Sequence, residues 1–310
     1  MAAHPLAHAD TTSWPALPLE EWEPTYRTVH RWSQVLGKVR MALTPPVNHW
    51  WHASLYVGER GLTTGPISNR GACFSLELGF HGHRLRVRCA DGRECGFALE
   101  PMSVAEFYRR TMETLRSIGV SVHINPTPQE VADTTPFDLD TVHASYDRDA
   151  VERLWRILSS VDEVFQETRW GFLGKQSPSH FFWGAFDLAI ARFSGRPNPQ
   201  PPSDRVMGEA YSHEVISHGF WPGGDWPFGE RVPEPVFYAY CVPKPEGFAT
   251  AAVRPRAAAW NAKLGEFLLP YEAVRTSADP RAALLEFIRS TYEAGAVAAG
   301  WDRPRLERAI

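Results

Sequence analysis

Apolar side chains recur at helical spacing in two long segments of the chain. Residues 23–43 carry an apolar side chain at every third or fourth position and end before a Thr-Pro-Pro sequence, where proline interrupts helical hydrogen bonding. Residues 149–172 show the same spacing, and Asp147 stands where its side chain can cap the first turn. The pattern therefore predicts two long amphipathic helices.

Alternating apolar and polar residues follow each of these helices, which is the pattern of strands with one buried face. Turn residues separate the candidate strands, so antiparallel hairpins are favoured. Each group of strands ends in a further helix: one begins at Ser103, where Glu106 completes a capping box, and the last begins at Asp279-Pro280. The candidate strands cover residues 49–57, 72–80, 83–99, 180–193, 210–216 and 236–242.

The order of helix, antiparallel strands and helix occurs twice, which predicts an α+β fold of two pseudo-equivalent halves around a central cleft. We interpret the repeat as an internal duplication, in which His49 corresponds to His180 and Glu77 corresponds to Glu214. The predicted organisation is a flexible N-terminus at 1–13, a first half at 14–124, a linker at 125–147 and a second half at 148–310.

The composition narrows the possible partners and the compartment. With 310 residues, of which 44% are hydrophobic, the chain can bury a substantial core without stabilising crosslinks. The net charge of -4 and the absence of basic runs argue against nucleic acid as a partner. No leader pattern or membrane-length apolar run is present, so we expect no membrane association and a cytoplasmic location. The four cysteines lack CxxC spacing, which disfavours a zinc site.

Familiar catalytic motifs are missing, but aromatic residues are abundant. The sequence has no GxSxG, Walker loop, HExxH or strand-linked GxGxxG, which disfavours covalent serine and nucleotide mechanisms. It does have 12 tryptophans, many of them clustered, and such clusters form either cores or the walls of ligand cavities. The candidate walls of a pocket for an apolar or aromatic small molecule are Trp50, Trp183, Phe220 and Trp221.

The main candidate for chemistry is "SPSHFFWGAFDLAIARF", residues 177–193. If the segment is one strand, Asp187 is the only carboxylate in a nearly continuous apolar strand. A buried carboxylate needs a cation or an imidazole as partner. A structural ion pair with Arg192 or Arg196 is one interpretation, and a functional site with His180 is the other.

A second candidate is "YSHEVISHGFWPGG", which holds His213 and Glu214. His213 is either a core histidine bonded to a carbonyl or a general base or metal ligand. Glu214 and its counterpart Glu77 are either exposed or meet as a carboxylate pair that shares a proton or a divalent ion. The predicted catalytic residues are His180, Asp187, His213 and Glu214, and a transition metal (Fe, Zn or Mn) would be bound by His49, His180, His213 and Glu214.

Several longer strings carry a family resemblance. "LTPPVNHWWHASLYVGERGLTTGPI", "SPSHFFWGAFDLAIARFSGRP" and "LGEFLLPYEAVR" resemble the bacterial family catalogued as domain of unknown function 5996, from about Trp14 to Leu306. The resemblance implies a bacterial soluble protein and no particular reaction. The family usually has a small residue where this chain has His218, so we expect no functional role for His218.

Three hypotheses follow. The leading one is a small-molecule enzyme that uses histidines and carboxylates for acid–base or metal-assisted chemistry in an aromatic-walled cleft. The second is a binding protein that holds a hydrophobic metabolite without turnover. The third is an assembly subunit whose Trp/Pro-rich loop "HGFWPGGDWPFG" forms a protein interface.

Overall fold

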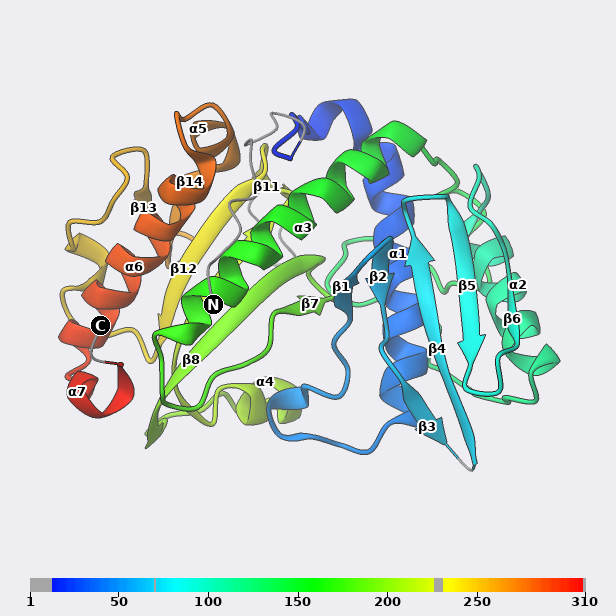
Figure 1. Cartoon of the computed structure of the whole chain (residues 1–310), viewed down its shortest axis with the longest axis horizontal. Coiled ribbons are helices and arrows are strands. Elements are labelled where there is room, and N and C mark those ends of the chain that lie inside the picture. The colour runs from blue at the N-terminus through cyan, green and yellow to red at the C-terminus, as the bar shows by residue number, and fades with distance from the viewer. Residues whose placement is uncertain (1–12, 70, 226–230, 309–310) are drawn as a thin grey trace, which may run out of the picture.

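The computed structural model describes residues 13–69, 71–225 and 231–308 and has an α+β fold (Figure 1). The α+β class that the sequence predicts is confirmed. Almost all of the N-terminal segment that was expected to be flexible lies outside the described residues. Among the described helices, none combines the length and the hydropathy that a membrane span requires.

Two antiparallel sheets form the framework. Sheet 1 has the strand order β1-β2-β4-β5-β6, with β3 paired to β4, and sheet 2 has the order β13-β14-β12-β9-β8-β7. Sheet 1 consists of β1 (Tyr56–Gly58), β2 (Gly61–Thr63), β3 (Ile67–Asn69), β4 (Ala72–Gly79), β5 (Arg84–Cys89) and β6 (Glu94–Ala98). Sheet 2 consists of β7 (His180–Phe182), β8 (Asp187–Pro197), β9 (His213–Trp221), β12 (Val236–Val242), β13 (Ala259–Asn261) and β14 (Glu266–Pro270). A small third sheet pairs β10 (Gly224–Asp225) with β11 (Arg231–Val232).

The two sheets touch at their edges, where Leu55 and Phe181 exchange both backbone hydrogen bonds at 2.9 Å. Helix α3 lies over this junction and contacts both β1 and β8, whereas α6 packs on β9 and β12. The helices are α1 (Leu19–Leu43), α2 (Val104–Ser117), α3 (Arg148–Trp170), α4 (Arg205–Ala210), α5 (Tyr271–Arg275), α6 (Pro280–Ala298), α7 (Arg303–Leu306) and the 3-10 turns η1 (Asn48–Trp50) and η2 (Phe248–Thr250). One continuous hydrophobic core runs through both sheets and α1, α2, α3 and α6, so the two predicted halves share their interior.

Helix α1 is buried around most of its circumference, including polar residues that its sequence pattern does not mark as interior. Their polar groups bond to backbone carbonyls of the segment predicted as a linker. The Gln34 side chain donates from Nε2 to the Gln129 carbonyl at 2.8 Å and accepts at Oε1 from the Gln129 amide at 2.7 Å, and Lys38 donates to the Asn125 carbonyl at 3.1 Å. These bonds satisfy groups that burial would otherwise penalise, and they hold the 125–147 segment along α1.

Capping residues place the helix starts where the sequence predicts them. Ser103 accepts a hydrogen bond from the Glu106 amide, Asp147 accepts from two amides of α3, and Asp279 accepts from the Ala282 amide. The hairpin of β5 and β6 also forms as predicted, and Gly92 in its turn has a φ of 88°, a conformation that glycine adopts without strain.

Two predicted strands are wrong. The segment 180–193 is a hairpin, because Trp183 leaves the strand to pack against Gly37 of α1 and to donate a hydrogen bond to the Ala53 carbonyl. The segment 49–57 is mostly irregular, because His49 and Trp50 have left-handed backbone conformations, with φ of 60° and 61°. Strands cannot contain such residues.

Candidate functional site

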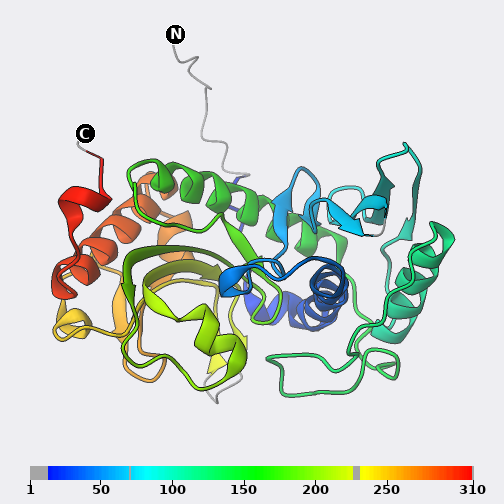
Figure 2. The ribbon, with the colours of Figure 1, turned by 90° about the horizontal axis from the view of Figure 1, so that it is seen from below.

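Sheet 2 has two unlike faces. One face packs on α3 and α6. On this face, Nε2 of His218 is hydrogen-bonded to the Thr291 hydroxyl of α6 at 2.9 Å, and Ile216 and Phe220 belong to the main core. The other, which we call the open face, is the side on which α4 lies, opposite α3 and α6 in Figure 2, and the residues at its centre, such as Ala189, Ser217 and Tyr238, are buried. By strand register the open face carries His180, Phe182, Asp187, Ala189, Ala191, Phe193, Val215, Ser217, Gly219, Trp221, Val236, Tyr238, Tyr240, Glu266 and Leu268.

Small residues occupy the centre of the open face. Ala189 and Ala191 on β8 lie beside Gly219 and Ser217 on β9. A Cβ atom on Gly219 would lie 2.2 Å from the Tyr238 ring, so glycine is required for this ring to lie across the strand. The centre of the open face therefore forms a floor of small residues beneath the tyrosines.

Three tyrosines and a carboxylate form a connected group beside this floor. Tyr238 donates a hydrogen bond to Oδ2 of Asp187 and stacks on Tyr240 with ring centroids 5.9 Å apart. The hydroxyls of Tyr240 and Tyr211 are 2.8 Å apart. Tyr240, Tyr211 and the neighbouring Glu266 are only partly buried, so solvent reaches this group from outside.

The carboxyl groups of this region have raised pKa values. Asp187 is only 7% exposed, and burial, opposed by the Tyr238 hydrogen bond and reinforced by the charge of Glu130, raises its pKa to about 7. Burial and the charge of Asp187 raise the pKa of Glu266 to about 8, and burial also raises the pKa of Glu130. No lysine or arginine of the described residues forms an ion pair with any of the three carboxyl groups. At neutral pH the group can therefore both accept and donate a proton.

The predicted structural pairing of Asp187 with an arginine is wrong. Arg192 faces α3, where it donates to the Thr168 carbonyl at 2.7 Å, because adjacent residues of a strand point to opposite faces. Arg196 bonds to Glu214 at 2.7 Å and to backbone carbonyls at the end of α6. The partner of Asp187 is instead Tyr238, which lies 51 residues later in the chain.

A small cavity of about 40 Å³ lies between α1, the 130–133 loop and the end of β9. It has room for about one water molecule. Its inner wall includes Tyr26, Glu130 and Trp221, and Tyr26 is close enough for the charge of Asp187 to affect its pKa. At its rim Arg27 bonds to Asp225 at 2.8 Å, within a network of surface ion pairs. The cavity therefore brings water close to the carboxyl groups from the side of α1.

A second polar group lies near the opposite end of β8. Nδ1 of His49 is 3.0 Å from the Ala210 carbonyl, and Nε2 is 2.8 Å from Nζ of Lys175. The His213 ring lies edge-on to the His49 ring at 5.9 Å, and its Nδ1 is 3.0 Å from the Ser212 hydroxyl. The structure thus brings together two of the predicted histidines, together with a lysine that the sequence analysis did not identify.

His180 lies in an aromatic enclosure rather than in either polar group. Its ring contacts Trp51, Tyr56 and Phe182 at centroid distances of 5.5, 5.6 and 5.4 Å, and it is 1% exposed. Neither ring nitrogen has a hydrogen-bond partner among the described residues. Burial, with the charges of nearby arginines, lowers its pKa to about 3, so the ring is neutral at physiological pH and does not bond to Asp187.

Replacing His180 with leucine is expected to raise the free energy of unfolding at pH 7 by about 1 kcal/mol, because the change removes two buried polar atoms without partners. This gain in stability should grow as the pH falls below 6.5, because His180 in the unfolded chain then binds a proton, whereas in the folded protein it does so only near pH 3. Urea unfolding at pH 7 and 5 measures both effects.

His30 provides the matched control. Its Nε2 bonds to the carbonyls of Gly184 at 2.7 Å and Trp183 at 3.1 Å, so His30→Leu should lower the stability by about 2 kcal/mol at pH 7. Equal losses in the two variants would mean that His180 has a structural partner.

The predicted carboxylate pair does not form. Glu214 is on the face opposite the open face and bonds to Arg196 and to the Ser194 hydroxyl at 2.9 Å. Glu77 is in sheet 1, where Arg86 donates to it at 3.0 Å and Arg88 lies at 3.5 Å. Each glutamate is therefore neutralised by its own arginines, and no proton or ion is shared between them.

The four aromatic residues that were predicted to line one pocket do not lie together. Phe220 packs in the main core against Phe237 and Tyr271, because the register of β9 turns it away from the open face. Trp183 packs against α1, and Trp50 lies off the sheet with the Arg205 guanidinium 5.8 Å from its ring. Trp221 alone among the four is on the open face, and it lines the small cavity.

Metal-ligand geometry is not found in the described part of the chain, where no group of three or more His, Cys, Asp or Glu could hold an ion. The predicted ligand set is separated: His49 and His213 lie together, His180 is enclosed by aromatic rings, and Glu214 is on the other face. The cysteines are unpaired thiols.

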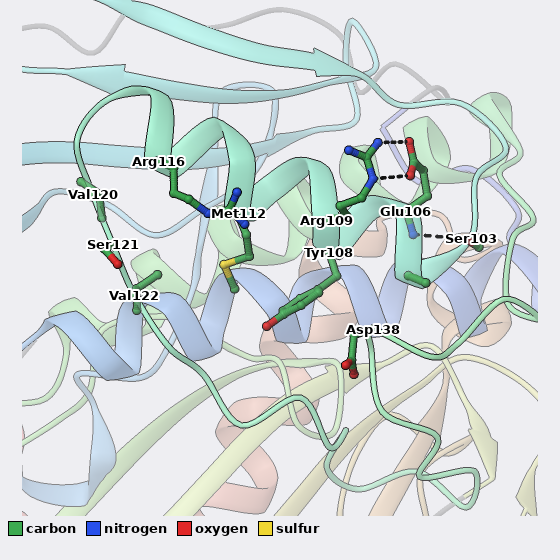
Figure 3. Close-up of a pocket in the computed structure, with 11 residues that line it drawn as sticks. Ser103, Glu106, Tyr108, Arg109, Met112, Arg116, Val120, Ser121, Val122 and Asp138 are labelled. Carbon is green, nitrogen blue, oxygen red and sulfur yellow. Dashed lines mark hydrogen bonds and ion pairs between the residues drawn. The ribbon is translucent and has the colours of Figure 1, made fainter.

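A larger cavity of about 480 Å³ lies along α2 (Figure 3). Helix α2 and sheet 2 are at opposite ends of the molecule in Figure 1. Its wall combines Tyr108 and Met112 with the Glu106–Arg109 ion pair at 2.7 Å, and Figure 3 shows this pair at the helix surface. Exposed ion pairs of this kind are screened by solvent and contribute little. The cavity offers no buried acid or base, so the acid and base groups favour the open face, although the cavity that borders it at Trp221 is smaller.

Sequence reasoning missed most of the open face. Tyr238 and Tyr240 stand two residues apart in the strand "VFYAYCV", which places them on one face, and Glu266 begins the strand "EFLLP" as its only charge. The sequence therefore marked these residues. It did not show that they lie near Asp187, because that depends on the pairing of β8, β9, β12 and β14.

The fold and the site define an α+β protein with a cluster of tyrosine and carboxyl groups on one face of an antiparallel sheet. A family model described as "Family of unknown function (DUF5996)" matches residues 14–308, so the chain belongs to the DUF5996 family. The expected resemblance is confirmed over nearly the whole chain. No curated protein and no solved structure matches the chain.

Proposed function

We propose that the protein is an enzyme that performs acid–base chemistry on a small molecule at the open face of sheet 2. One observation supports this most: Asp187 accepts a hydrogen bond from Tyr238 beside a floor of small residues and lies close enough to Glu266 for their charges to interact, and no lysine or arginine of the described residues pairs with either carboxyl group. Placing unpaired carboxyl groups in such a position costs stability, which proteins tolerate mainly at functional sites.

The pKa values suggest the role of each group. With a pKa of about 7, Asp187 is partly ionised at neutral pH and serves as the general base, while Tyr238 holds its carboxylate in place. Glu266, with a pKa of about 8, is mostly protonated and serves as the general acid. Because like charges repel in a poorly solvated site, the substrate is neutral or cationic rather than anionic.

The proposal includes the internal duplication and places the working site in the second half only. Sheets 1 and 2 are both antiparallel, and each follows a long helix and precedes another, which supports the duplication. In sheet 1 the carboxylate of Glu77 is neutralised by two arginines, whereas Asp187 and Glu266 are not. We assign the central cleft of this proposal to the small cavity that Trp221 lines, between α1 and the end of β9.

We also propose a cytoplasmic location. Free thiols persist in reducing compartments, and the unpaired cysteines support this assignment. They are Cys73, Cys89, Cys95 and Cys241.

Depletion of small molecules by the purified protein tests the enzyme proposal. The full chain is incubated with a pool of neutral and cationic organic metabolites, and mass spectrometry follows every compound. We expect at least one compound to be converted, with the rate lowered about 100-fold by Glu266→Gln and by Asp187→Asn, the size typical of losing an acid or base. Glu214→Gln is the control, because that carboxylate already bonds to Arg196 on the other face.

Two results would contradict the proposal. Conversion that persists unchanged in both Asp187→Asn and Glu266→Gln would place the chemistry elsewhere than the open face. A compound that binds and raises the melting temperature of the native protein but is never converted would favour the second hypothesis, a binding protein for a hydrophobic metabolite, and the aromatic residues of the open face are consistent with such a ligand.

A further inference from the structure

Lys175 and His49 form a hydrogen-bonded pair away from the carboxyl groups. Nζ of Lys175 is 2.8 Å from Nε2 of His49, and no carboxylate of the described residues forms an ion pair with this lysine. Nδ1 of His49 is 3.0 Å from the Ala210 carbonyl, which can only accept a hydrogen bond. The proton of the neutral ring is therefore on Nδ1, and the lone pair of Nε2 faces the lysine.

The backbone holds the imidazole in this position at a cost. His49 and Trp50 are consecutive residues with φ near 60°, and each non-glycine residue in such a conformation costs about 1 kcal/mol or more. The Phe193 ring packs against the His49 ring at 4.7 Å and fixes its orientation. Strain of this kind persists where surrounding contacts enforce it, and it is concentrated at functional positions.

Aromatic rings flank the amine. Nζ of Lys175 lies 5.3 Å from the Trp51 ring and 5.4 Å from the Phe193 ring, and the side chain remains open to solvent. Burial by these rings lowers the pKa of Lys175, and burial and the nearby ammonium lower the pKa of His49. A lysine next to an imidazole base, rather than next to a carboxylate, more readily loses its proton.

We propose that Lys175 is a nucleophilic amine that condenses with the carbonyl group of an aromatic or apolar aldehyde or ketone, with His49 as its base. Nζ of the neutral amine forms a bond to the carbonyl carbon as the C=O π bond breaks, and His49 moves one amine proton to the oxygen, which gives a carbinolamine. His49 then takes the second amine proton and supplies a proton to the hydroxyl, and the C–O bond breaks as water leaves. The products are an imine and one water molecule. This site shares no residue with the cluster of Asp187, Glu266 and Tyr238, so its test is independent of the proposed function.

Reductive trapping of benzaldehyde tests the proposal. The full chain is treated with benzaldehyde and sodium cyanoborohydride, which reduces an imine to a stable benzylamine, and peptide mapping gives the rate at each lysine. Lys244 is the matched control, since it is also exposed and lies 5.3 Å from an aromatic ring, that of Trp260. We expect labelling at Lys175 to be at least about tenfold faster, a modest effect for a neighbouring base.

The variant His49→Asn should reduce labelling at Lys175 to the rate of Lys244, because asparagine tolerates the left-handed backbone but supplies no base. Equal rates at Lys175 and Lys244 in the native protein would overturn the proposal without any variant. A fast Lys175 that is unaffected by His49→Asn, in a variant whose circular dichroism matches the native protein, would also overturn it.

Discussion

Replacing Asp187 with asparagine is expected to stabilise the protein at pH 8 by about 3 kcal/mol. The pKa of the carboxyl group is 3.8 in the unfolded chain and about 7 in the folded protein. Below pH 3.8 the group is protonated in both states and costs nothing. As the pH rises from 3.8 to 7, the unfolded chain releases its proton first, so folding stability is lost. Above pH 7 the loss is complete at about 4 kcal/mol, since one unit is about 1.4 kcal/mol.

Asparagine removes most of this loss, because its amide oxygen still accepts the hydrogen bond from Tyr238 and carries no charge. Urea unfolding of the native protein and Asp187→Asn at pH 4 and pH 8 measures the effect. The two proteins should differ little at pH 4 and clearly at pH 8. A gain in stability together with a loss of turnover is the behaviour of a carboxylate retained for function.

Asp140 supplies the control with the opposite sign. Asp140 is 1% exposed and is thus buried like Asp187. Unlike Asp187, it has basic partners, because its carboxylate lies 3.3 Å from Nε of Arg31 and 2.8 Å from Nδ1 of His143. Asp140→Asn leaves the buried guanidinium of Arg31 without its counterion, so it should destabilise the protein by about 3–5 kcal/mol. If Asp187→Asn were as harmful as Asp140→Asn at pH 8, Asp187 would be a structural residue and the proposed role would fail.

Replacing Gly37 with alanine is expected to destabilise the protein by about 2–3 kcal/mol, although the same change in an ordinary helix interior stabilises by about 1 kcal/mol. A Cβ atom at this position would lie 2.1 to 2.4 Å from three atoms of the Trp183 ring. The indole would have to move, and its hydrogen bond to the Ala53 carbonyl, 2.8 Å long, would break. Thermal and urea unfolding measure the loss.

Gly171 at the end of α3 is the control for this substitution. It has a φ of -75°, and a Cβ atom there would meet nothing within 4 Å. Gly171→Ala should therefore change the stability by less than about 0.5 kcal/mol, the usual range for surface substitutions. A stable Gly37→Ala protein would show that Trp183 is free to reposition, and the contact between α1 and the β7–β8 turn would then be adaptable.

Local patterns in the sequence predicted the elements that depend on local interactions. The apolar spacing of α1 and α3, the Ser103 and Asp147 caps and the β5–β6 hairpin are all formed, because each rests on residues a few positions apart. The same reasoning failed at 180–193, since the break at Trp183 is made by a glycine of α1 almost 150 residues earlier.

The candidate site was predictable in part. Asp187 was identified because a lone carboxylate in an apolar strand needs an explanation, and the structure makes it the centre of the tyrosine and carboxyl group. His180, its expected partner, is enclosed by three aromatic rings instead. Glu214 was misjudged, because periodicity gives the face of a strand only after the strand's neighbours are known.

The sequence by itself determined the α+β class, the long helices with their caps, and the presence of one costly buried carboxylate, because these follow from spacing, capping and composition, which act over short distances along the chain. The resemblance of its longer strings identified the family. Only the tertiary structure decided which residues meet Asp187 and which histidine meets Lys175. Those meetings are set by strand order and register in sheet 2 and by the left-handed turn at His49, and contacts between distant segments fix both.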